Sequence, residues 1–425
     1  MSQVELQRQI EVLAAANAAL GRDPADEAAA EAMAGALVML GRFDDVLRLA
    51  DHLNATAGAG KGWIAVACAL HRLLAERRYG QLLALCEGIP VDSPGHILTV
   101  YYAGCSRMML DEMAEALERF DWFRRHVRFY ADHIAFALHP LLNMIYRQGR
   151  MTAAPDEIDR RLELPVGRAA VEHLGELAPS GEGEAALFSC LDDQYFSLFG
   201  PGFVEANREL NPDTPLLLHV IAPSEVTRQR LIELTQRWPG LFAASVEPEP
   251  LFRTVTYYAS ARFFVADRLM ERHGRPLISL DGEIKVAVES LTLAAACRHL
   301  DFACFGTGRD EPGSVWQASV MWFGQGPATR RFLATLQAYC WPELDHPSLM
   351  TWQLDQAALL ACRHFFQIRG LDLAFGDLRE VLGLQLADVA TDVTSAEAKE
   401  ANKHGKINDE AHHLGLRLGE LYATL

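Results

Sequence analysis

Apolar residues along the chain follow two different periods. From residue 1 to about 175, Leu and Ala recur at helical spacing, and alternating runs of Val, Ile and Thr are scarce. That spacing gathers apolar side chains on one stripe of a helix. Beyond about residue 185, short continuous apolar runs alternate with amphipathic stretches. The second pattern is typical of buried parallel strands joined by helices, so the sequence predicts a helical half followed by an α/β half.

The helical half contains a unit that recurs along the chain. Its copies are "ALVMLGRFDDVLRLADHL" (36–53), "LHRLLAERRYGQLLALCEG" (70–88) and, more loosely, "YAGCSRMMLDEMAEALERF" (102–120). Each copy predicts a helix, a short turn and a second helix opened by Phe43, Tyr79 or Met113, which lie 36 and 34 residues apart. This period resembles that of tetratricopeptide (TPR) repeats, whose hairpins bury their apolar faces by stacking on neighbours. An irregular helical bundle is the alternative.

The composition changes in the stretch "LAPSGEGEAALFSC" (177–190), where Pro and Gly residues interrupt the helical pattern and indicate a linker. We therefore predict a TPR-like helical repeat domain over 1–176 and an α/β domain over 185–425. Strands of the second domain are expected at 185–190, 215–223, 241–247 and 276–281, with helices at 224–238 and 257–274. Such alternation favours a mainly parallel sheet covered by helices on both faces.

Charge and cysteine usage narrow the class of protein. The formal net charge of −17 argues against a general binder of nucleic acid or anionic membranes. No apolar run reaches the roughly 18 to 20 residues of a membrane span. The eight Cys residues form no Cys-x-x-Cys pair, which disfavours zinc and is typical of reduced thiols. The N-terminal stretch lacks the features of a signal peptide, so a cytoplasmic location is expected.

Two carboxylates follow the last of the predicted strands, in "RPLISLDGEIKV" (275–286). If Asp281 and Glu283 belong to an extended segment, they point to the same side and converge. Ligands of open α/β sheets bind at the carboxyl ends of strands, and two acids that repel each other favour a divalent cation whose other ligands are water and phosphate. A solvated turn with incidental acids is the alternative. Lys285 is a second candidate to neutralise the acids, or to meet a phosphate.

The surrounding sequence resembles the GT-A glycosyltransferases. The stretch 256–286, "TYYASARFFVADRLMERHGRPLISLDGEIKV", is similar to the helix and strand that lead into their metal-binding Asp-x-Asp (DxD) motif. Three further segments appear in family order: "FSCLDDQYFSLF" (188–199), "WQASVMWFGQGPATRRFLATL" (316–336) and "WQLDQAALLACRHF" (352–365), which resembles their Asp-Gln motif. The chain departs from the family in three ways. Its second acid is Glu283, Lys285 stands where an apolar residue is usual, and a common Asn is absent from "QASVMWF".

The resemblance implies a metal-dependent glycosyltransferase with a GT-A domain, which moves a sugar from a nucleotide-diphosphate sugar to a protein or glycan acceptor. It implies Mn²⁺ or Mg²⁺ as cofactor and an acceptor selected partly by the helical repeats. The implied metal ligands are Asp281, Glu283 and His404. The implied catalytic residues are Asp355 and Gln356. The implied donor-binding residues are Asp192, Asp193, Tyr195, Tyr258, Arg262 and Lys406.

Each implied role has a structural alternative. Asp355 could be a helix cap, Arg262 part of a structural ion pair, and residues 192–195 a surface turn. The stretch 401–413, which holds His404 and Lys406, could be a solvated tail, and His219 reads as a satisfied core histidine. For the whole chain, the alternative function is a non-catalytic scaffold or protein-interaction module, in which a degenerate GT-A-like half docks beside a partner-binding array.

Overall fold

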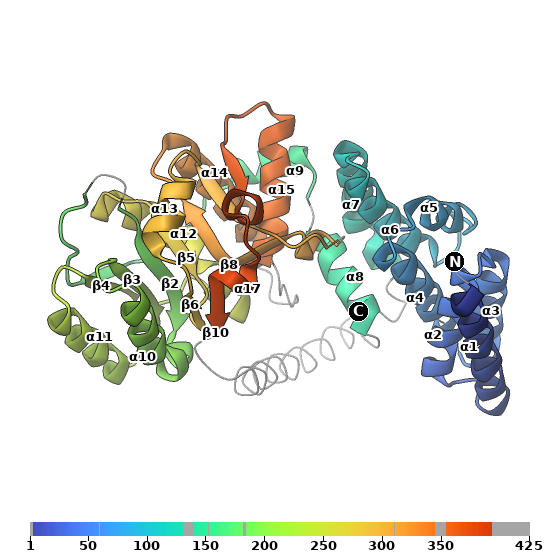
Figure 1. The fold of residues 1–425 in the computed structure, drawn as a ribbon. Helices are drawn as coiled ribbons and strands as arrows, with labels where there is room; N and C mark the ends of the chain where they lie inside the picture. Colours follow the sequence, from blue (N-terminus) through green and yellow to red (C-terminus); the bar gives the residue numbers. More distant parts are fainter. Residues whose placement is uncertain are drawn as a thin grey trace. The chain divides into compact units, whose positions relative to one another are not determined.

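The structure is a computed structural model that describes residues 3–58, 60–130, 140–151, 153–181, 184–309, 311–344 and 354–392 (Figure 1). The chain divides into two compact units. The first comprises Met1–Ala154 with Arg309–Pro312, and the second comprises Pro155–Gly308 with Gly313–Leu425. The units therefore part at residue 154, upstream of the 177–184 stretch in which the sequence pattern placed the linker.

The first unit is helical. Its helices are α1 (Gln3–Arg22), α2 (Glu27–Met39), α3 (Phe43–Thr56), α4 (Lys61–Ala75), α5 (Tyr79–Glu87), α6 (His96–Met109), α7 (Met113–Tyr130) and α8 (Pro140–Met151). The residues expected to open the second helix of each hairpin, Phe43, Tyr79 and Met113, are the first residues of α3, α5 and α7. The recurring helix–turn–helix unit is thus present, while its assignment to the TPR class stays a prediction.

The three hairpins share one turn geometry. Gly41, Arg77 and Asp111 have φ of 72°, 56° and 64°, and each stands two residues before the second helix. The N–H of the following residue closes each turn onto the carbonyl five positions earlier, at 2.8 to 2.9 Å. This is the Schellman arrangement, which satisfies the last carbonyls of a helix. Gly adopts this conformation readily, Asp is one of the other residues that tolerate it, and Arg77 is the unusual residue of the three.

The second unit is built on an eight-stranded sheet of order β1-β4-β3-β2-β5-β8-β7-β9. The strands are β1 (Glu172–Leu174), β2 (Ala186–Asp192), β3 (Leu216–Ile221), β4 (Phe242–Glu247), β5 (Leu277–Leu280), β7 (Phe302–Gly306), β8 (Trp316–Phe323) and β9 (Phe375–Asp377). The central strands β4, β3, β2 and β5 are parallel, and β8 runs antiparallel to β5 and β7. A separate antiparallel pair joins β6 (Ile284–Val286) to β10 (Ala390–Asp392). The four strands predicted from apolar runs are confirmed.

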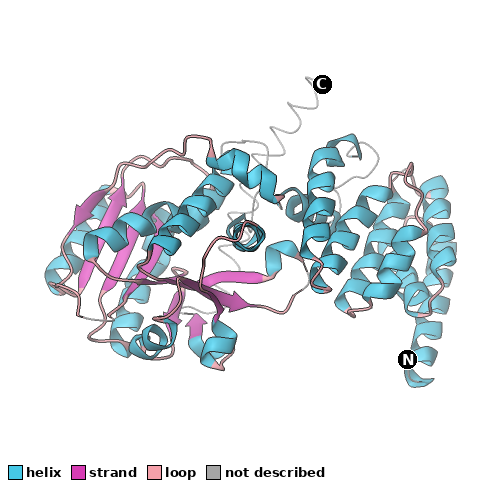
Figure 2. Cartoon of the chain, turned by 90° about the horizontal axis from the view of Figure 1, so that it is seen from above, coloured by secondary structure: helices cyan, strands magenta, loops and turns pink. Residues whose placement is uncertain are grey.

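Helices cover both faces of this sheet (Figure 2). They are α9 (Pro155–Leu162), α10 (Asp193–Leu210), α11 (Glu225–Arg237), α12 (Val255–His273), α13 (Ser290–Cys297), α14 (Pro327–Leu344), α15 (Leu354–Ile368), α16 (Leu378–Leu382) and α17 (Leu386–Val389). Helices α10, α11 and α13 enclose one apolar core with alternate residues of the strands. Helix α12 contacts β2 and helix α15 contacts β8, and both helices contact α14. The second unit is therefore of the mixed α/β class, with a largely parallel sheet.

Residues 155–178 belong to the sheet unit because their contacts lie there. The buried Arg161 on α9 donates to the carbonyl of Tyr339 (2.6 Å) and pairs with Glu343 (2.8 Å), both on α14. Strand β1 extends the sheet beside β4, and Arg268 on α12 donates to the carbonyl of Ala169 (2.9 Å). The spacing of apolar residues along the chain cannot reveal such long-range contacts. This explains why the boundary between the units lies earlier in the chain than the linker predicted at 177–184.

None of the helices in the described ranges is long and apolar enough to cross a lipid bilayer.

Candidate functional site

The parallel strands bring several acids to one edge of the sheet. Strands β2, β4 and β5 run in the same direction, and their carboxyl ends carry Asp192, Glu247 and, one residue past β5, Asp281. This edge is where open α/β sheets bind ligands. We call the group formed there by Asp281, Glu283, Arg262 and Asp355 the carboxyl-edge site.

Asp281 is held by an arginine from the helix above the sheet. The Nη2 of Arg262 on α12 lies 2.7 Å from Oδ1 of Asp281. The other guanidinium nitrogens donate to the carbonyls of Ala259 and Ala318, each at 2.8 Å. Burial lowers the pKa of Arg262, but the nearby carboxylates of Asp281 and Asp355 outweigh it and raise that pKa above its usual value. A fixed, permanently charged guanidinium therefore faces the acids.

The chain turns sharply after Asp281. The N–H of Ile284 donates to the carbonyl of Asp281 at 3.0 Å, so residues 281–284 form a turn rather than an extended segment. A Cβ at Gly282 would overlap the buried side chain of Leu191 at the end of β2, so a larger residue here would require Leu191 to move. The expectation that Asp281 and Glu283 point to one side because the chain is extended is wrong.

The turn nevertheless keeps the two acids near a common group. Burial raises the pKa of the Tyr195 hydroxyl, and the carboxylates of Glu283, Asp281 and Asp192 raise it further. Glu283 is buried, with 7% of its surface exposed. Lys285 lies half-buried in β6 opposite Thr391 of β10. Within the part of the chain that the structure describes, the ion-pair partner of Asp281 is Arg262 and not Lys285.

Asp355 joins the carboxyl-edge site from the first turn of α15. Only 9% of its surface is exposed. Burial raises the pKa of Asp355 to about 6, the Arg262 guanidinium opposes this rise, and the Asp281 carboxylate adds to it. Oδ1 of Asp355 accepts the N–H of Gln356 at 2.9 Å. A carboxyl group with this pKa can hold or release a proton near neutral pH.

Gln356 is directed to the backbone instead. With the amide oriented so that its nitrogen donates, it bonds the carbonyls of Gly313 (2.7 Å) and Trp316 (3.2 Å). Its amide thus secures the loop before β8, which leaves Asp355 as the member of this pair that faces the other acids.

The first strand ends in two acids that organise the neighbouring turns. Oδ1 of Asp192 accepts the N–H of Tyr195 at 2.6 Å and caps α10. Oδ1 of Asp193 accepts the N–H and the hydroxyl of Ser224, both at 2.9 Å, which joins the turn before α10 to the turn before α11. Burial alone would raise the pKa of Asp193, but hydrogen bonds from Thr227 and Ser224 outweigh it and lower that pKa. Asp192 is therefore the helix cap of α10, a role that the sequence analysis did not assign to it.

The remaining predicted site residues are placed as follows. Tyr258 is half-buried on α12, with its ring centroid 6.3 Å from that of Tyr257. His404 and Lys406 lie outside the described residues, so their implied roles stay predictions.

A metal ion would find two carboxylates at the carboxyl-edge site, Asp281 and Glu283. The described residues contain no group of three or more His, Cys, Asp or Glu side chains that could hold a metal ion. Mg²⁺ and similar hard cations are commonly held by one or two carboxylates, with water and phosphate oxygens completing the shell. The donor chemistry therefore fits a cation that arrives with a diphosphate.

Polar residues beneath α12 form a network that the sequence reading missed. His219, Ser245 and Glu247 lie on β3 and β4, and Tyr257 lies on α12. The prediction that His219 is a satisfied core residue is confirmed, because its ring nitrogens lie 2.9 Å from the Ser245 hydroxyl and 3.4 Å from Glu247. The sequence feature that could have revealed this network is the presence of polar residues at alternate positions of otherwise apolar strands.

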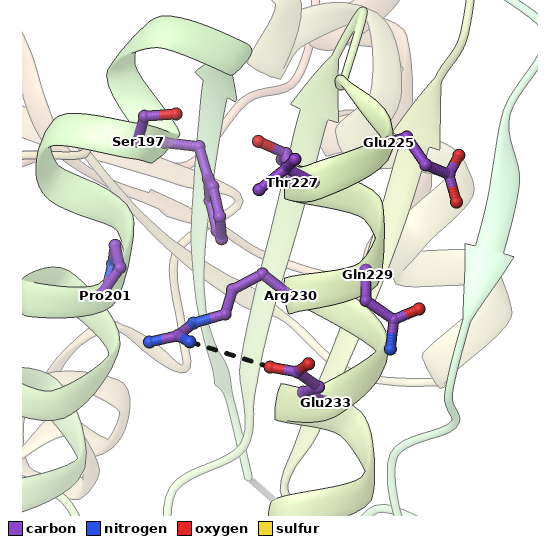
Figure 3. A pocket seen from close by; sticks show the side chains of 9 residues that line it. Ser197, Pro201, Glu225, Thr227, Gln229, Arg230 and Glu233 are labelled. Atoms are coloured by element: carbon purple, nitrogen blue, oxygen red, sulfur yellow. Dashed lines mark ion pairs between the residues drawn. The ribbon is translucent and has the colours of Figure 1, made fainter.

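A surface hollow of about 580 Å³ lies between α10 and α11 (Figure 3). Its wall includes Ser197 and Pro201 from α10, and Glu225, Arg230 and Glu233 from α11. Arg230 and Glu233 face each other across 3.8 Å. None of the predicted site residues lines this hollow. The hollow is therefore lined by other residues than those of the carboxyl-edge site.

No protein-family model matches the chain, and no curated protein matches it. Among solved structures, the chain is similar to the apo structure of the WbbM bifunctional glycosyltransferase, at a TM-score of 0.32 and 14% identity over 44% of this chain and 39% of that one. It is also similar to apo mouse xyloside xylosyltransferase 1, at a TM-score of 0.29 and 12% identity over 46% of this chain and 84% of that one. Both of these structural neighbours are glycosyltransferases, and the chain spans less than half of the first.

Proposed function

We propose that the chain is a glycosyltransferase that uses a nucleotide-diphosphate sugar as donor. The observation that carries the proposal is the meeting of Asp281, Arg262 and the buried Asp355 at the carboxyl edge of the parallel strands. Ligands bind at this edge in open α/β sheets, and clustered, perturbed acids in such a place are typical of a functional site.

The residues have distinct roles in this proposal. Asp192 and Asp193 shape the turns that receive the nucleotide, with Tyr195 beside them. Tyr258 lies on the donor side of α12. Asp355 faces the sugar and accepts the proton of the acceptor hydroxyl as the bond from the sugar to the diphosphate breaks and the bond to the acceptor oxygen forms. The pKa of about 6 leaves Asp355 mostly ionised at pH 7 and able to take that proton.

Asp281 and Glu283 would hold Mn²⁺ or Mg²⁺, joined by His404 if the implied ligand set holds. A cation held there would neutralise charge on the diphosphate leaving group. Arg262 keeps Asp281 oriented when no cation is bound, because its guanidinium is fixed by two backbone carbonyls. Lys406 is the proposed contact of the diphosphate.

The helical unit is proposed to select a protein or glycan acceptor. Its repeated hairpins support the assignment, because stacked hairpins of this kind offer extended binding surfaces. The TPR class, like the acceptor, belongs to this proposal.

Isothermal titration of the full chain with uridine and guanosine diphosphates, with and without Mn²⁺, tests the donor site. One of the nucleotides is expected to bind in a Mn²⁺-dependent way, and Asp281→Asn is expected to remove that dependence. Asp372→Asn, an exposed acid of the same unit, is the matched control and should bind as the wild type does. Absence of nucleotide binding under every metal condition would overturn the proposal.

A non-catalytic scaffold is the second candidate. The observation that favours it is the ion pair from Arg262 to Asp281, which already neutralises one of the two proposed metal ligands. In that case neither diphosphate binds, and Arg262→Met lowers stability because it leaves Asp281 and Asp355 facing each other without a cation.

A further inference from the structure

Glu247 is a fully buried carboxylate whose hydrogen bonds are all supplied by protein groups. It ends β4, and its relative exposure is 0%. The Tyr257 hydroxyl lies 2.9 Å from both carboxylate oxygens, and the N–H of Leu251 donates to Oε1 at 2.8 Å. Nε2 of His219 lies 3.4 Å from Oε2. Three separate chain segments thus converge on one carboxylate.

The hydrogen-bond directions in this network are mutually consistent. The Ser245 hydroxyl lies 2.9 Å from Nδ1 of His219, so it donates to that nitrogen while Nε2–H points to Glu247. We call Glu247, His219, Ser245 and Tyr257 the Glu247 network.

Stability alone does not account for these residues. Replacing a buried polar or ionic group by an apolar one of similar volume is often neutral or stabilising. Leu217 and Ile221 flank His219 on the same face of β3 and are buried and apolar, which shows that this layer accepts apolar side chains. Aromatic rings shield the network, since the Tyr257 ring lies 5.6 Å from that of Phe252 and 5.8 Å from that of Phe264. The polar groups are therefore buried together and hydrogen-bond to one another and to the Leu251 N–H.

The network fixes the helix that delivers Arg262. Tyr257 lies in the first turn of α12, where Thr254 caps the helix by accepting the N–H of Tyr257 at 3.1 Å. Arg262 follows five residues later, about 7.5 Å along the helix axis. Glu247 holds Tyr257 and also Leu251, just before the helix, so it sets both the start and the rotation of α12.

We propose that Glu247, acting through Tyr257, is a positioning residue that aligns Arg262 with Asp281 and so prepares the carboxyl-edge site for a diphosphate. The ligand class, a nucleoside diphosphate, rests on the proposed function. The alignment itself does not, because the ion pair from Arg262 to Asp281 exists without ligand. Register supports the connection, since Cys190 on β2 stands opposite His219. Burial raises the pKa of the Cys190 thiol, the Arg262 guanidinium opposes this rise and the Glu247 carboxylate adds to it, so Cys190 lies near both groups.

The alignment is tested on the full chain by the Nε–H signal of Arg262 in ¹H–¹⁵N NMR with ¹⁵N-labelled arginine, assigned by its loss in Arg262→Lys. Tyr257→Phe and Glu247→Gln are expected to shift or broaden this signal without bound ligand. Tyr339→Phe is the matched control, because its hydroxyl is also buried but has no hydrogen-bond partner in the described part of the chain. The control should leave the Arg262 signal in place.

The consequence for binding is measured separately with uridine and guanosine diphosphates and Mn²⁺. The affinity of whichever binds the wild type is expected to fall roughly tenfold in Tyr257→Phe and Glu247→Gln, as is common when a supporting contact of a ligand site is removed. An Arg262 signal that matches the wild type in both variants overturns the positioning role, even if affinity falls. If the wild type binds neither nucleotide, the proposed function fails, while a shifted signal still supports the alignment. Tyr257→Phe preserves the test if Glu247→Gln does not fold.

Discussion

The two faces of the sheet are made from the same strands but differ in chemistry. Along β3, Leu216, Leu218 and Val220 face α10 and α11, whereas the alternate residues, including His219, face α12. The first face is an apolar core, and the second carries the Glu247 network and leads to Arg262 and Asp355. Apolar packing thus stabilises the sheet from one side, while the other side buries the charged groups of Glu247, Arg262 and Asp355. Truncations and substitutions on each side can test whether the two faces act separately.

Removing residues 155–184 should disrupt the α12 face most. A chain of residues 155–425 is expected to fold, whereas one of residues 185–425 loses α9 and β1 and leaves the buried Glu343 without its Arg161 partner. We expect the shorter chain to aggregate or to melt far below the longer one. Circular dichroism melting of the two truncated chains makes the comparison. Equal melting temperatures would show that 155–184 is a dispensable linker.

Leu218→Ala should damage the apolar face alone. Its side chain is fully buried in the α10 and α11 core, so the substitution is expected to cost about 2 to 5 kcal/mol of unfolding free energy. Urea unfolding measures the loss. Nucleotide affinity of the folded protein should stay within twofold of the wild type, and a large drop would mean that the two faces are not independent.

Asp355→Asn should change stability in a pH-dependent way. The pKa of Asp355 is raised from 3.8 to about 6 in the folded protein, so the folded state binds a proton more tightly than the unfolded chain does. The wild type therefore loses stability relative to the variant as pH rises from about 4 to 6, by on the order of 3 kcal/mol, and the difference is constant above that range. Unfolding at pH 4.5 and 7.5 checks this. A difference that does not change with pH contradicts the raised pKa.

The smallest effect is expected at Asp192, where two roles can be separated. Asp192→Ala removes the cap of α10 and should cost about 1 kcal/mol. Asp192→Ser keeps a capping oxygen and should nearly restore stability, but it removes the carboxylate. Comparing the nucleotide affinities of the two variants decides whether the charge contributes to binding. If Asp192→Ser restores both stability and affinity, the residue acts only as a cap.

Local period and turn chemistry were sufficient for much of the architecture. Apolar runs located β2, β3, β4 and β5. The second helix of each hairpin begins at the residue predicted for it, which is Phe43, Tyr79 or Met113. These features depend on near neighbours in the chain, because strand burial and helix initiation are set over a few residues. The sequence also singled out Arg262 as a donor-binding residue or a member of a structural ion pair.

Tertiary structure alone decided which partner Arg262 takes and how acidic Asp355 is. Asp281 lies 19 residues from Arg262, and Asp355 reaches both from another helix, so their energies depend on contacts that no local pattern contains. The same reason places 155–178 with the sheet and brings Gly282, in the 281–284 turn, against Leu191 of a neighbouring strand. Burial and long-range contact set the pKa values and ion pairs of this chain, and both exist only once its strands and helices have packed.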